Sequence, residues 1–478
     1  MDASLNQTLA QEKPACAHSN HEDNLQLIQI PADRNPLLEK LLPSDSDGGS
    51  DSVSNFSTLE TNTNASISQV DDCDQLGSNL WSGADCYGSD SKLGKQVDNF
   101  FQAVGWQALA SIATDYRDGI QCSYADPDTY SIGQFNMVRR LDFVDGVRWV
   151  ARVRLPPEAT HFPLGRYNSQ RAFETEVASM KFFKSKSDIP VPEVFVYDPD
   201  SSNSIGAPYM LIEYIHGTTA EDLRSIRNSE PSIFGTSEQD QKFRQQMASI
   251  QARVLTFQFP KIGSLYHDES TDSFYIGPDM NTGMGPWGTP AEYYKDLTDS
   301  LLKQSAARRC RDPEKEKFFC APALLNHLMS LYGQGCNGQY SLVNRDFGAH
   351  NILVDGDFNI VGVIDLDSVF AGPLEAVAQY PGFCGLDPEP PGIVETNPYA
   401  LKRIEIMTPQ LEEYKNLLMR YEAMFRNGMA SISSMLGSRG AMIHLGFESC
   451  GEVFGFQNEV WFSSAVAMLK EHAITQCN

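Results

Sequence analysis

The sequence predicts an α+β fold of two lobes, in which a smaller lobe rich in β-strands precedes a larger, mainly helical lobe. Up to about residue 215, strand-like segments of β-branched and aromatic residues are bounded by Gly, Pro, Asn and Asp. Beyond that point, long segments repeat their apolar residues at spacings of three and four, which is typical of amphipathic helices. The 478 residues, of which 41% are hydrophobic, are sufficient to bury a large core.

The N-terminal part differs in composition from the remainder. Residues 1–90 contain 15 Asp or Glu against three Lys or Arg, so they hold almost half of the net charge of −25. From Pro43 to Asp90 the chain is rich in Ser, Asp, Asn and Gly, with too few branched apolar residues to offset the entropy lost on ordering. We therefore expect residues 1–95 to be a disordered acidic extension, either a regulatory phosphorylation region or a solvated segment without a specific partner.

The strand-rich lobe is expected to span residues 96–215. Asp145 and Gly146 can supply the tight turn of a hairpin between two strand-like segments. The helix after this hairpin must end before the two prolines of "DIPVPEV", which cannot continue it. The predicted elements are, in order, a helix at 96–116, the hairpin at 134–155, a helix at 169–187 and strands at 194–198 and 208–215.

The larger lobe, residues 216–478, is expected to be helical around a single hairpin. The hairpin lies between Asn344 and Asp367, where "NILVD" and "NIVGVID" are strand-like and "DGD" can form the turn. Helices are predicted at 239–259, 292–306, 322–332 and 409–428.

The hairpin carries residues suited to phosphoryl transfer. This reaction needs a carboxylate that orients an attacking hydroxyl and accepts its proton, and oxygen ligands that hold Mg²⁺ against the phosphates. Asp346 suits the first role, and Asn351 follows it in the D-x-x-x-x-N spacing. The returning strand is expected to bring Asp365 beside Asn351. If this segment stood alone, a surface hairpin with Asp365 and Asp367 as solvated charges would explain the same sequence.

Several segments together resemble the aminoglycoside phosphotransferase-like family of small-molecule kinases, particularly its fungal members. The "NRDFGAHNILVD" loop and the "VIDLD" strand are similar to the family's H-x-D-x-x-x-x-N-I-L-V-D loop and I-D-W-E-type strand. Upstream, "WVARVRLP", "FETEVASMKFF" and "IGAPYMLIEYIHG" resemble the strand that contacts phosphate, the helix with its partner Glu and the hinge between the lobes. The resemblance covers roughly residues 100–450 and implies a protein-kinase-like two-lobed fold.

The resemblance also implies ATP and Mg²⁺ as cofactors and a hydroxyl-bearing small molecule as substrate. Asp346 would be the catalytic base, and Asn351 and Asp365 would be the Mg²⁺ ligands. Arg152 would hold the α- and β-phosphates, oriented by Glu176. The further residues implied to bind the nucleotide are Gly133 in the loop over the phosphates, and Glu213 and Ile215 in the hinge strand.

Two positions depart from the family pattern. Asn344 replaces the usual His two residues before the base, which puts the precision of the loop in question rather than the chemical step. Arg152 stands where kinases broadly use Lys, and Glu174 competes with Glu176 as its partner. A catalytically weak or inactive pseudokinase that binds nucleotide or a partner is therefore the alternative to an enzyme. A protein kinase is disfavoured, because the residues after Asp365 show neither a D-F-G nor an A-P-E landmark.

Charge, cysteines and hydropathy argue against several other classes. The net charge of −25 argues against nucleic acid or an anionic membrane as the main partner. The ten Cys show no CxxC pair, and His350 alone favours a hydrogen-bonding role over zinc. The sequence shows neither a bilayer-spanning apolar run nor a signal or transit peptide, so we expect a cytoplasmic location. An antibiotic, a choline-like amine, a sugar or a secondary metabolite all remain open as substrate, and the oligomeric state is not predicted.

Overall fold

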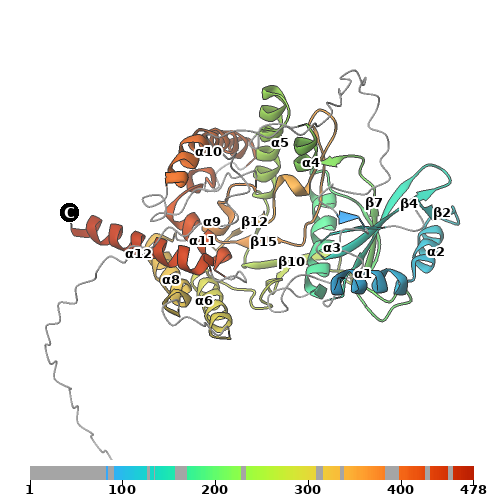
Figure 1. Cartoon of the computed structure of the whole chain (residues 1–478), viewed down its shortest axis with the longest axis horizontal. Helices are drawn as coiled ribbons and strands as arrows, with labels where there is room; N and C mark the ends of the chain where they lie inside the picture. Colours follow the sequence, from blue (N-terminus) through green and yellow to red (C-terminus); the bar gives the residue numbers. More distant parts are fainter. Residues whose placement is uncertain are drawn as a thin grey trace, which may run out of the picture. The chain divides into compact units, whose positions relative to one another are not determined.

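Within the residues that the structure, a computed structural model, describes, seven strands form the antiparallel sheet of the first lobe (Figure 1). The strands pair in the order β1-β3-β4-β5-β7-β6, and β2 pairs with β4. Their bounds are β1 Ser82–Gly83, β2 Cys122–Tyr124, β3 Ser131–Ile132, β4 Asn136–Phe143, β5 Arg148–Arg154, β6 Val194–Asp198 and β7 Tyr209–Glu213. The described residues are 82–83, 91–125, 130–133, 135–156, 169–227, 233–307, 316–333, 338–382, 398–425, 431–450 and 456–477.

The β4–β5 hairpin confirms the prediction made from its turn residues. Gly146 has a φ of +86°, a conformation that glycine adopts without a steric penalty. The two strands pair along their whole length, from Asp142 opposite Arg148 to Asn136 opposite Arg154. This register places Arg152 and Arg154 on one face of the sheet, because side chains alternate along a strand.

The segment predicted as a helix at 96–116 forms two helices, α1 (Lys92–Ala103) and α2 (Trp106–Tyr116). The break falls at Gly105, where an added Cβ would lie 2.9 Å from the carbonyl oxygen of Ser204. Helix α1 begins three residues before the predicted end of the acidic extension, and the Ser91 side chain caps it by accepting the Gly94 N–H. The remainder of the predicted extension, apart from strand β1, lies outside the described residues.

Helix α3 (Ser169–Lys186) packs against β10 (Gly263–Asp268) of the second lobe, as Figure 1 shows. Its apolar side chains join the core of that lobe rather than the smaller core between the first sheet, α1 and α2. The α3 residues in the larger core are Phe173, Val177, Met180, Phe182 and Phe183. Helix α3 therefore holds its polar residues in a position set by the second lobe.

The second lobe contains more strand than the single hairpin that the sequence predicts. An antiparallel sheet pairs in the order β11-β10-β15-β12-β9, and a smaller one pairs β14-β13-β8. Helix α5 (Ser237–Val254) accordingly ends before the predicted residue 259, and β9 occupies its last predicted residues. The strands not yet given are β8 Thr218–Thr219, β9 Gln258–Phe259, β11 Ser273–Gly277, β12 Tyr340–Asn344, β13 Ile352–Val354, β14 Ile360–Val363 and β15 Val369–Gly372.

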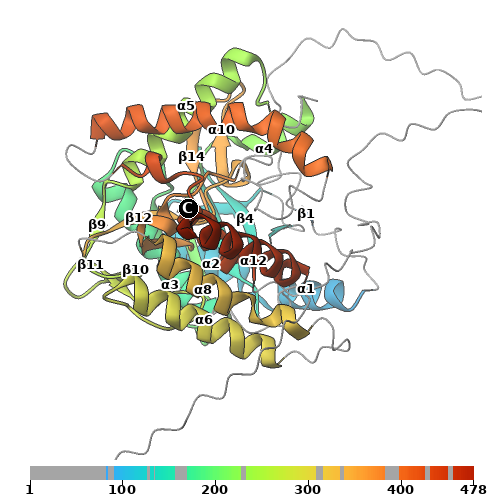
Figure 2. The same ribbon diagram turned by 90° about the vertical axis from the view of Figure 1, so that its left-hand side faces the viewer.

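Helices pack around these sheets and confirm the helical character predicted for this lobe. Helix α10 (Pro398–Phe425) crosses α5, and α8 (Ala321–Tyr332) packs between α6 (Pro290–Ala307) and α12 (Phe456–Cys477) (Figure 2). Helix α10 begins eleven residues before the predicted start at Pro409, which lies inside it. The remaining helices are α4 Ala220–Ile226, α9 Leu374–Val377, α11 Arg439–Ser449 and the short 3₁₀ turns η2 Lys317–Cys320, η3 Ala349–Asn351 and η4 Ser433–Met435.

The arrangement confirms the predicted protein-kinase-like α+β fold. A sheet-rich lobe leads through the end of β7 into a lobe whose β13–β14 hairpin follows the loop at Asp346. Over the described ranges, no helix combines the length and apolar character needed to cross a membrane.

Candidate active site

The loop between β12 and β13 holds the carboxylate of Asp346 at both of its oxygens. Nε2 of His350 lies 3.1 Å from Oδ1, and Nδ2 of Asn351 donates to Oδ2 at 3.0 Å. The Asn351 amide also donates to the main-chain oxygen of Asp346 at 3.1 Å. Asp346 remains 49% exposed, so its carboxylate is both fixed and accessible.

These contacts set the charge of the carboxylate. Burial acts to raise the pKa of Asp346, but the hydrogen bonds from His350 and Asn351 outweigh it and lower the pKa below its ordinary value. The same contact with Asp346 raises the pKa of His350, against the effect of its own burial. Asp346 is therefore an ionised proton acceptor at neutral pH, as a general base requires.

A glycine makes room for the His350 ring. A Cβ added to Gly348 would lie 2.5 Å from Cε1 of His350 and 2.9 Å from the main-chain oxygen of Gly382. The loop is tied down at the same place, because Gly382 donates its N–H to the main-chain oxygen of Phe347. Any side chain at residue 348 would displace the ring that contacts Asp346.

Asn344, where the family pattern has His, braces the loop from the end of β12. Its Oδ1 accepts the backbone N–H of Asp346 at 3.0 Å, and its backbone pairs with Val369 of β15. The side chain is 7% exposed, and its Nδ2 has no hydrogen-bond partner within the described part of the chain. The substitution thus retains one loop contact and leaves a buried donor without an acceptor.

Arg152 on β5 joins two acidic residues from different elements. One guanidinium nitrogen donates to Glu176 of α3, and Nη2 donates to Oδ1 of Asp365 at 3.0 Å. Glu176 is fully buried, whereas Glu174 lies at an exposed contact with Gln170. Burial opposes the charge of Arg152, but Glu176 and Asp365 outweigh it and keep the pKa of the guanidinium above its ordinary range. The structure therefore selects Glu176 over Glu174 as the partner of Arg152.

Two further charged residues belong to this cluster and were not assigned a role from the sequence. Arg154, two residues along β5, lies 3.9 Å from the second oxygen of Glu176. Asp367 is 7% exposed, and burial together with Asp365 and Glu176 raises its pKa well above the ordinary range. The R-x-R spacing in a strand could have indicated Arg154, because alternate residues share a face.

The donor set fits a magnesium ion. Asn351 uses its Nδ2 for Asp346, which leaves Oδ1 for another contact, and Asp365 is 38% exposed. Asp367 lies close to the carboxylates of Asp365 and Glu176. A divalent cation bound here would reduce the repulsion between these negative charges. No group of three or more His, Cys, Asp and Glu forms a metal cage in the described ranges, but Mg²⁺ beside phosphates needs only one or two carboxylates.

The two predicted hinge residues, Glu213 and Ile215, differ in whether their backbone N–H is already hydrogen-bonded. The backbone N–H of Glu213 donates to the main-chain oxygen of Glu193, and its side chain accepts from Lys184 at 2.8 Å. In contrast, the N–H of Ile215 has no partner in the part of the chain that the structure describes. The Ile215 side chain packs on Gly362 of β14, where an added Cβ would lie 3.0 Å from its Cδ1. Ile215 therefore offers a hinge donor, and Glu213 could contribute only an oxygen.

Gly133 lies in the turn between β3 and β4, and its N–H donates to the main-chain oxygen of Asn136. The side chain of Asn136 accepts from Arg154 at 3.2 Å, so this turn lies near the end of β5 that carries Arg152 and Arg154. Space is open at Gly133, because an added Cβ would meet nothing nearer than 3.9 Å. The position suits a loop that approaches phosphates.

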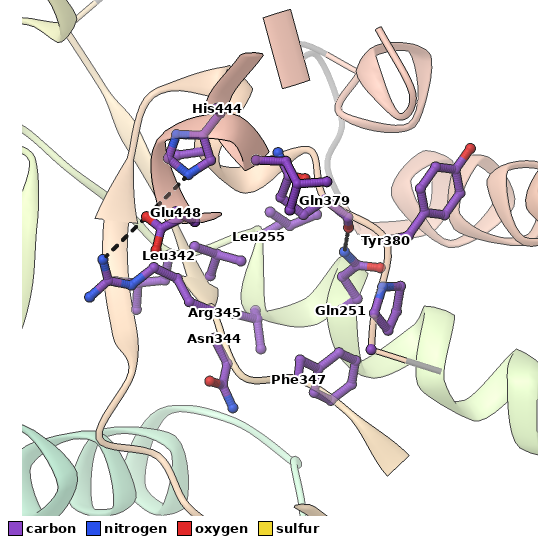
Figure 3. A pocket seen from close by; sticks show the side chains of 16 residues that line it. Gln251, Leu255, Leu342, Asn344, Arg345, Phe347, Gln379, Tyr380, His444 and Glu448 are labelled. Carbon is purple, nitrogen blue, oxygen red and sulfur yellow. Dashed lines mark hydrogen bonds and ion pairs between the residues drawn. The ribbon is translucent and has the colours of Figure 1, made fainter. Parts of the chain in front are cut away.

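A cavity of about 270 Å³ lies beside the loop, lined by the residues that flank Asp346 but not by Asp346 itself (Figure 3). Arg345 and His444 both lie near Glu448 in this cavity, at 3.9 Å and 3.7 Å respectively. No feature of the sequence indicated this cavity, because its walls come from segments far apart along the chain. The lining residues are Gln251, Val254, Leu255, Leu342, Val343, Asn344, Arg345, Phe347, Ala376, Gln379, Tyr380, Pro381, Gly382, His444, Leu445 and Glu448.

The sequence matches the model of the phosphotransferase enzyme family (APH) over residues 133–376. A subtelomeric hrmA-associated cluster protein of Aspergillus fumigatus is 26% identical over 328 residues, which cover 55% of this chain and 61% of that protein. Altered inheritance of mitochondria protein 9, mitochondrial, of Candida dubliniensis is 27% identical over 188 residues, or 37% of this chain and 29% of that protein. The chain thus spans less than two thirds of the length of these curated relatives.

Among solved structures, the macrolide 2′-phosphotransferase MphH from Brachybacterium faecium aligns with a TM-score of 0.41 and 14% sequence identity. The alignment covers 76% of this chain and 96% of that chain.

Proposed function

Because the chain belongs to the phosphotransferase enzyme family, we propose that it transfers the γ-phosphoryl group of ATP, with Mg²⁺, to a hydroxyl group of a small molecule. The observation that carries this proposal is the carboxylate of Asp346, which is ionised, accessible and held at both oxygens by His350 and Asn351. A residue that only stabilised the loop would not need an accessible charge.

Each residue of the site has a defined task in this reaction. Asp346 orients the acceptor hydroxyl and takes its proton as the oxygen attacks the γ-phosphorus in line. Arg152, kept charged by Glu176, binds phosphate oxygens, and its planar fork suits two of them at once. Mg²⁺, held by oxygens of Asn351, Asp365 and Asp367, would neutralise charge on the phosphates.

The hinge would bind the adenine ring. Ile215 offers a backbone donor, and its side chain against Gly362 provides an apolar wall of the kind that a flat base requires. Glu213 would contribute its main-chain oxygen only, because its N–H is already used by Glu193.

Substitution of Asp346 tests the enzymatic proposal. We expect Asp346→Asn to lower the rate of ADP release, with ATP, Mg²⁺ and a panel of alcohols, by roughly 10²–10⁴-fold, while nucleotide binding is retained. The matched control is Asp357→Asn in the exposed turn of the β13–β14 hairpin, which should change neither quantity. ATP turnover that is unaffected by Asp346→Asn would count against an enzyme that uses this base.

The second candidate is a pseudokinase, a nucleotide- or partner-binding module with little or no turnover. The observation that favours it is the buried, unpaired Nδ2 of Asn344 beneath Asp346, because a loosely held loop would position the base poorly. Nucleotide binding without ADP release from any alcohol in the panel is the outcome expected of a pseudokinase. For the phosphotransferase, we also propose a cytoplasmic location and a small-molecule rather than nucleic-acid substrate.

A further inference from the structure

We propose that the cavity beside the catalytic loop is the subsite for the body of the acceptor, and that this acceptor is a compact, weakly polar alcohol rather than a polyhydroxylated or polycationic one. The inference rests on the proposed phosphotransfer and concerns which alcohols the same site takes. Asn344, Arg345 and Phe347, the immediate neighbours of Asp346 in the loop, line the cavity. A molecule seated there lies against the segment that carries the base.

The size and walls of the cavity limit what it can hold. Its volume of about 270 Å³ lies just below the range of most ligand pockets, which measure roughly 300–1,000 Å³. Much of its lining is apolar, so a compact apolar body would fill it with a gain from the removal of apolar surface from water. The apolar lining residues are Val254, Leu255, Leu342, Val343, Phe347, Ala376, Pro381 and Leu445.

Most polar groups of the cavity are already bonded within the protein. The amide of Gln251 donates to the main-chain oxygen of Gln379 at 2.9 Å and accepts from Tyr414 at 2.8 Å. The Gln379 amide donates to main-chain oxygens of Glu375 and Ala441. Both N–H groups of Gln379 are therefore used, and Gln251 keeps one N–H besides the one bonded to Gln379.

Arg345 is likewise engaged and gives the cavity no free cation. It forms an ion pair with the buried Asp279 at 3.1 Å and lies over the ring of Phe370 at 4.5 Å. Asp279 in turn accepts from the backbone and the hydroxyl of Thr282. Arg345 is thus fixed as part of the wall.

Besides the second N–H of Gln251, one charged group at the cavity remains available to a ligand. The Nδ2 of Asn344 has no hydrogen-bond partner in the described ranges but almost no accessible surface, so it adds no donor to the cavity. The Glu448 side chain is 39% exposed. Its Oε1 lies 3.9 Å from a guanidinium nitrogen of Arg345 and 3.7 Å from Nε2 of His444, and both distances are too long for a hydrogen bond. Figure 3 shows Glu448 beside Arg345 and His444 in the wall of the cavity.

Gln251 and Glu448 define the polar features of the acceptor. Gln251 would donate one hydrogen bond, and Glu448 would accept from one donor at the far end of the molecule. A sugar or an aminoglycoside would lose the hydration of its other hydroxyls without finding partners, which disfavours its binding. The class is therefore an alcohol with a compact apolar body and a single distal donor.

Matched alcohols test this class. Phenylethanediol, para-hydroxyphenylethanediol, glucose and kanamycin are each offered to the protein with ATP and Mg²⁺, and ADP release gives kcat and KM. We expect para-hydroxyphenylethanediol to have the highest kcat/KM, roughly 10-fold or more above glucose and kanamycin. A preference for glucose or kanamycin over both diols would overturn the inference.

Variants of the cavity test its location. We expect Leu445→Trp, which fills the cavity, to raise the KM for the diols by roughly 10-fold or more while the affinity for nucleotide stays the same. The matched control is Leu331→Trp on the exposed side of α8, which should leave KM unchanged. Glu448→Gln should reduce the advantage of the para-hydroxy diol over phenylethanediol. An unaltered KM in a folded Leu445→Trp variant would overturn the assignment of the cavity.

Calorimetry separates this inference from the proposed function. If no alcohol releases ADP, binding of para-hydroxyphenylethanediol is measured directly on the wild-type chain and on Leu445→Trp. Binding that Leu445→Trp abolishes would keep the cavity as the site for this class and reject phosphotransfer. Absence of binding to the wild-type chain would reject the cavity assignment as well.

Discussion

Glu174 and Glu176 lie two residues apart on α3 and have different environments. Glu176 is fully buried beside Arg152, whereas Glu174 accepts a hydrogen bond from Gln170 at the surface. A buried carboxylate whose partner is an arginine contributes to the position of that arginine, and its removal leaves a buried charge without compensation.

We therefore expect Glu176→Gln to raise the KM for ATP by roughly 10-fold or more, because Arg152 loses the contact that orients it toward phosphate. The measurement is ADP release at varied ATP concentration, with the midpoint of thermal unfolding as a check on folding. Glu174→Gln on the same helix is the matched control and should change neither value. Equal effects of the two substitutions would show that Arg152 does not depend on Glu176.

The sequence predicted the central residues of the site better than their companions. Asp346, Asn351 and Asp365 follow from a spacing that reaches over a single hairpin, which is a local feature of the chain. Arg154 shares a face of β5 with Arg152, which their spacing could have indicated, whereas Asp367 joins the cluster only through burial. Packing between segments so far apart in the sequence could not be deduced from one sequence.

At the scale of single elements, the catalytic loop and the turn of the hairpin after it each contain a glycine, and the two have different surroundings. A Cβ at Gly348 would collide with His350 and Gly382, whereas a Cβ at Gly356 in the hairpin turn would meet nothing nearer than 3.8 Å. Neither residue has a positive φ, so the difference is one of space and not of backbone strain.

We expect Gly348→Ala to lower kcat by about 10-fold or more, because the methyl group displaces the His350 ring from Asp346 and misplaces the base. Steady-state kinetics with an accepted alcohol measure the effect. Gly356→Ala is the control and should retain full activity. If both variants were equally active, the contact between His350 and Asp346 would not be required for positioning.

Local turn chemistry explains which elements the sequence predicted. The β4–β5 and β13–β14 hairpins were predicted because each has its turn residues between two strand-like segments. The five-stranded sheet of the second lobe was missed because its strands contain two to six residues and, apart from the β10–β11 hairpin, pair with segments far along the chain. Short strands with distant partners leave little periodic signal.

At the scale of the whole molecule, His444 links stability to pH. This residue is buried on α11, with Nδ1 at 3.2 Å from the hydroxyl of Tyr294 and Nε2 near Glu448. Burial lowers its pKa to about 4, even though Glu448 acts to raise it. Between pH 4 and the ordinary value of 6.5, the unfolded chain binds more protons at this position than the folded chain.

The contribution of His444 to stability should therefore be complete above about pH 6.5 and be lost as the pH falls toward 4. We expect a loss on the order of 3 kcal/mol in the free energy of unfolding across this range from this residue. Chemical denaturation of the wild-type chain and of His444→Gln at several pH values measures it. Identical pH slopes for the two proteins would contradict the prediction.

Helix α3 packs in the second lobe, but the strand that carries Arg152 belongs to the sheet of the first. The guanidinium thus receives contacts from the two halves of the molecule at once, from Glu176 on one element and from Asp365 on another. A substitution that changes the packing of β10 against α3 would shift Glu176 and, through it, Arg152. Under the proposed function, differences in affinity for ATP among relatives would therefore be sought in the packing of β10 as well as in the residues that touch the nucleotide.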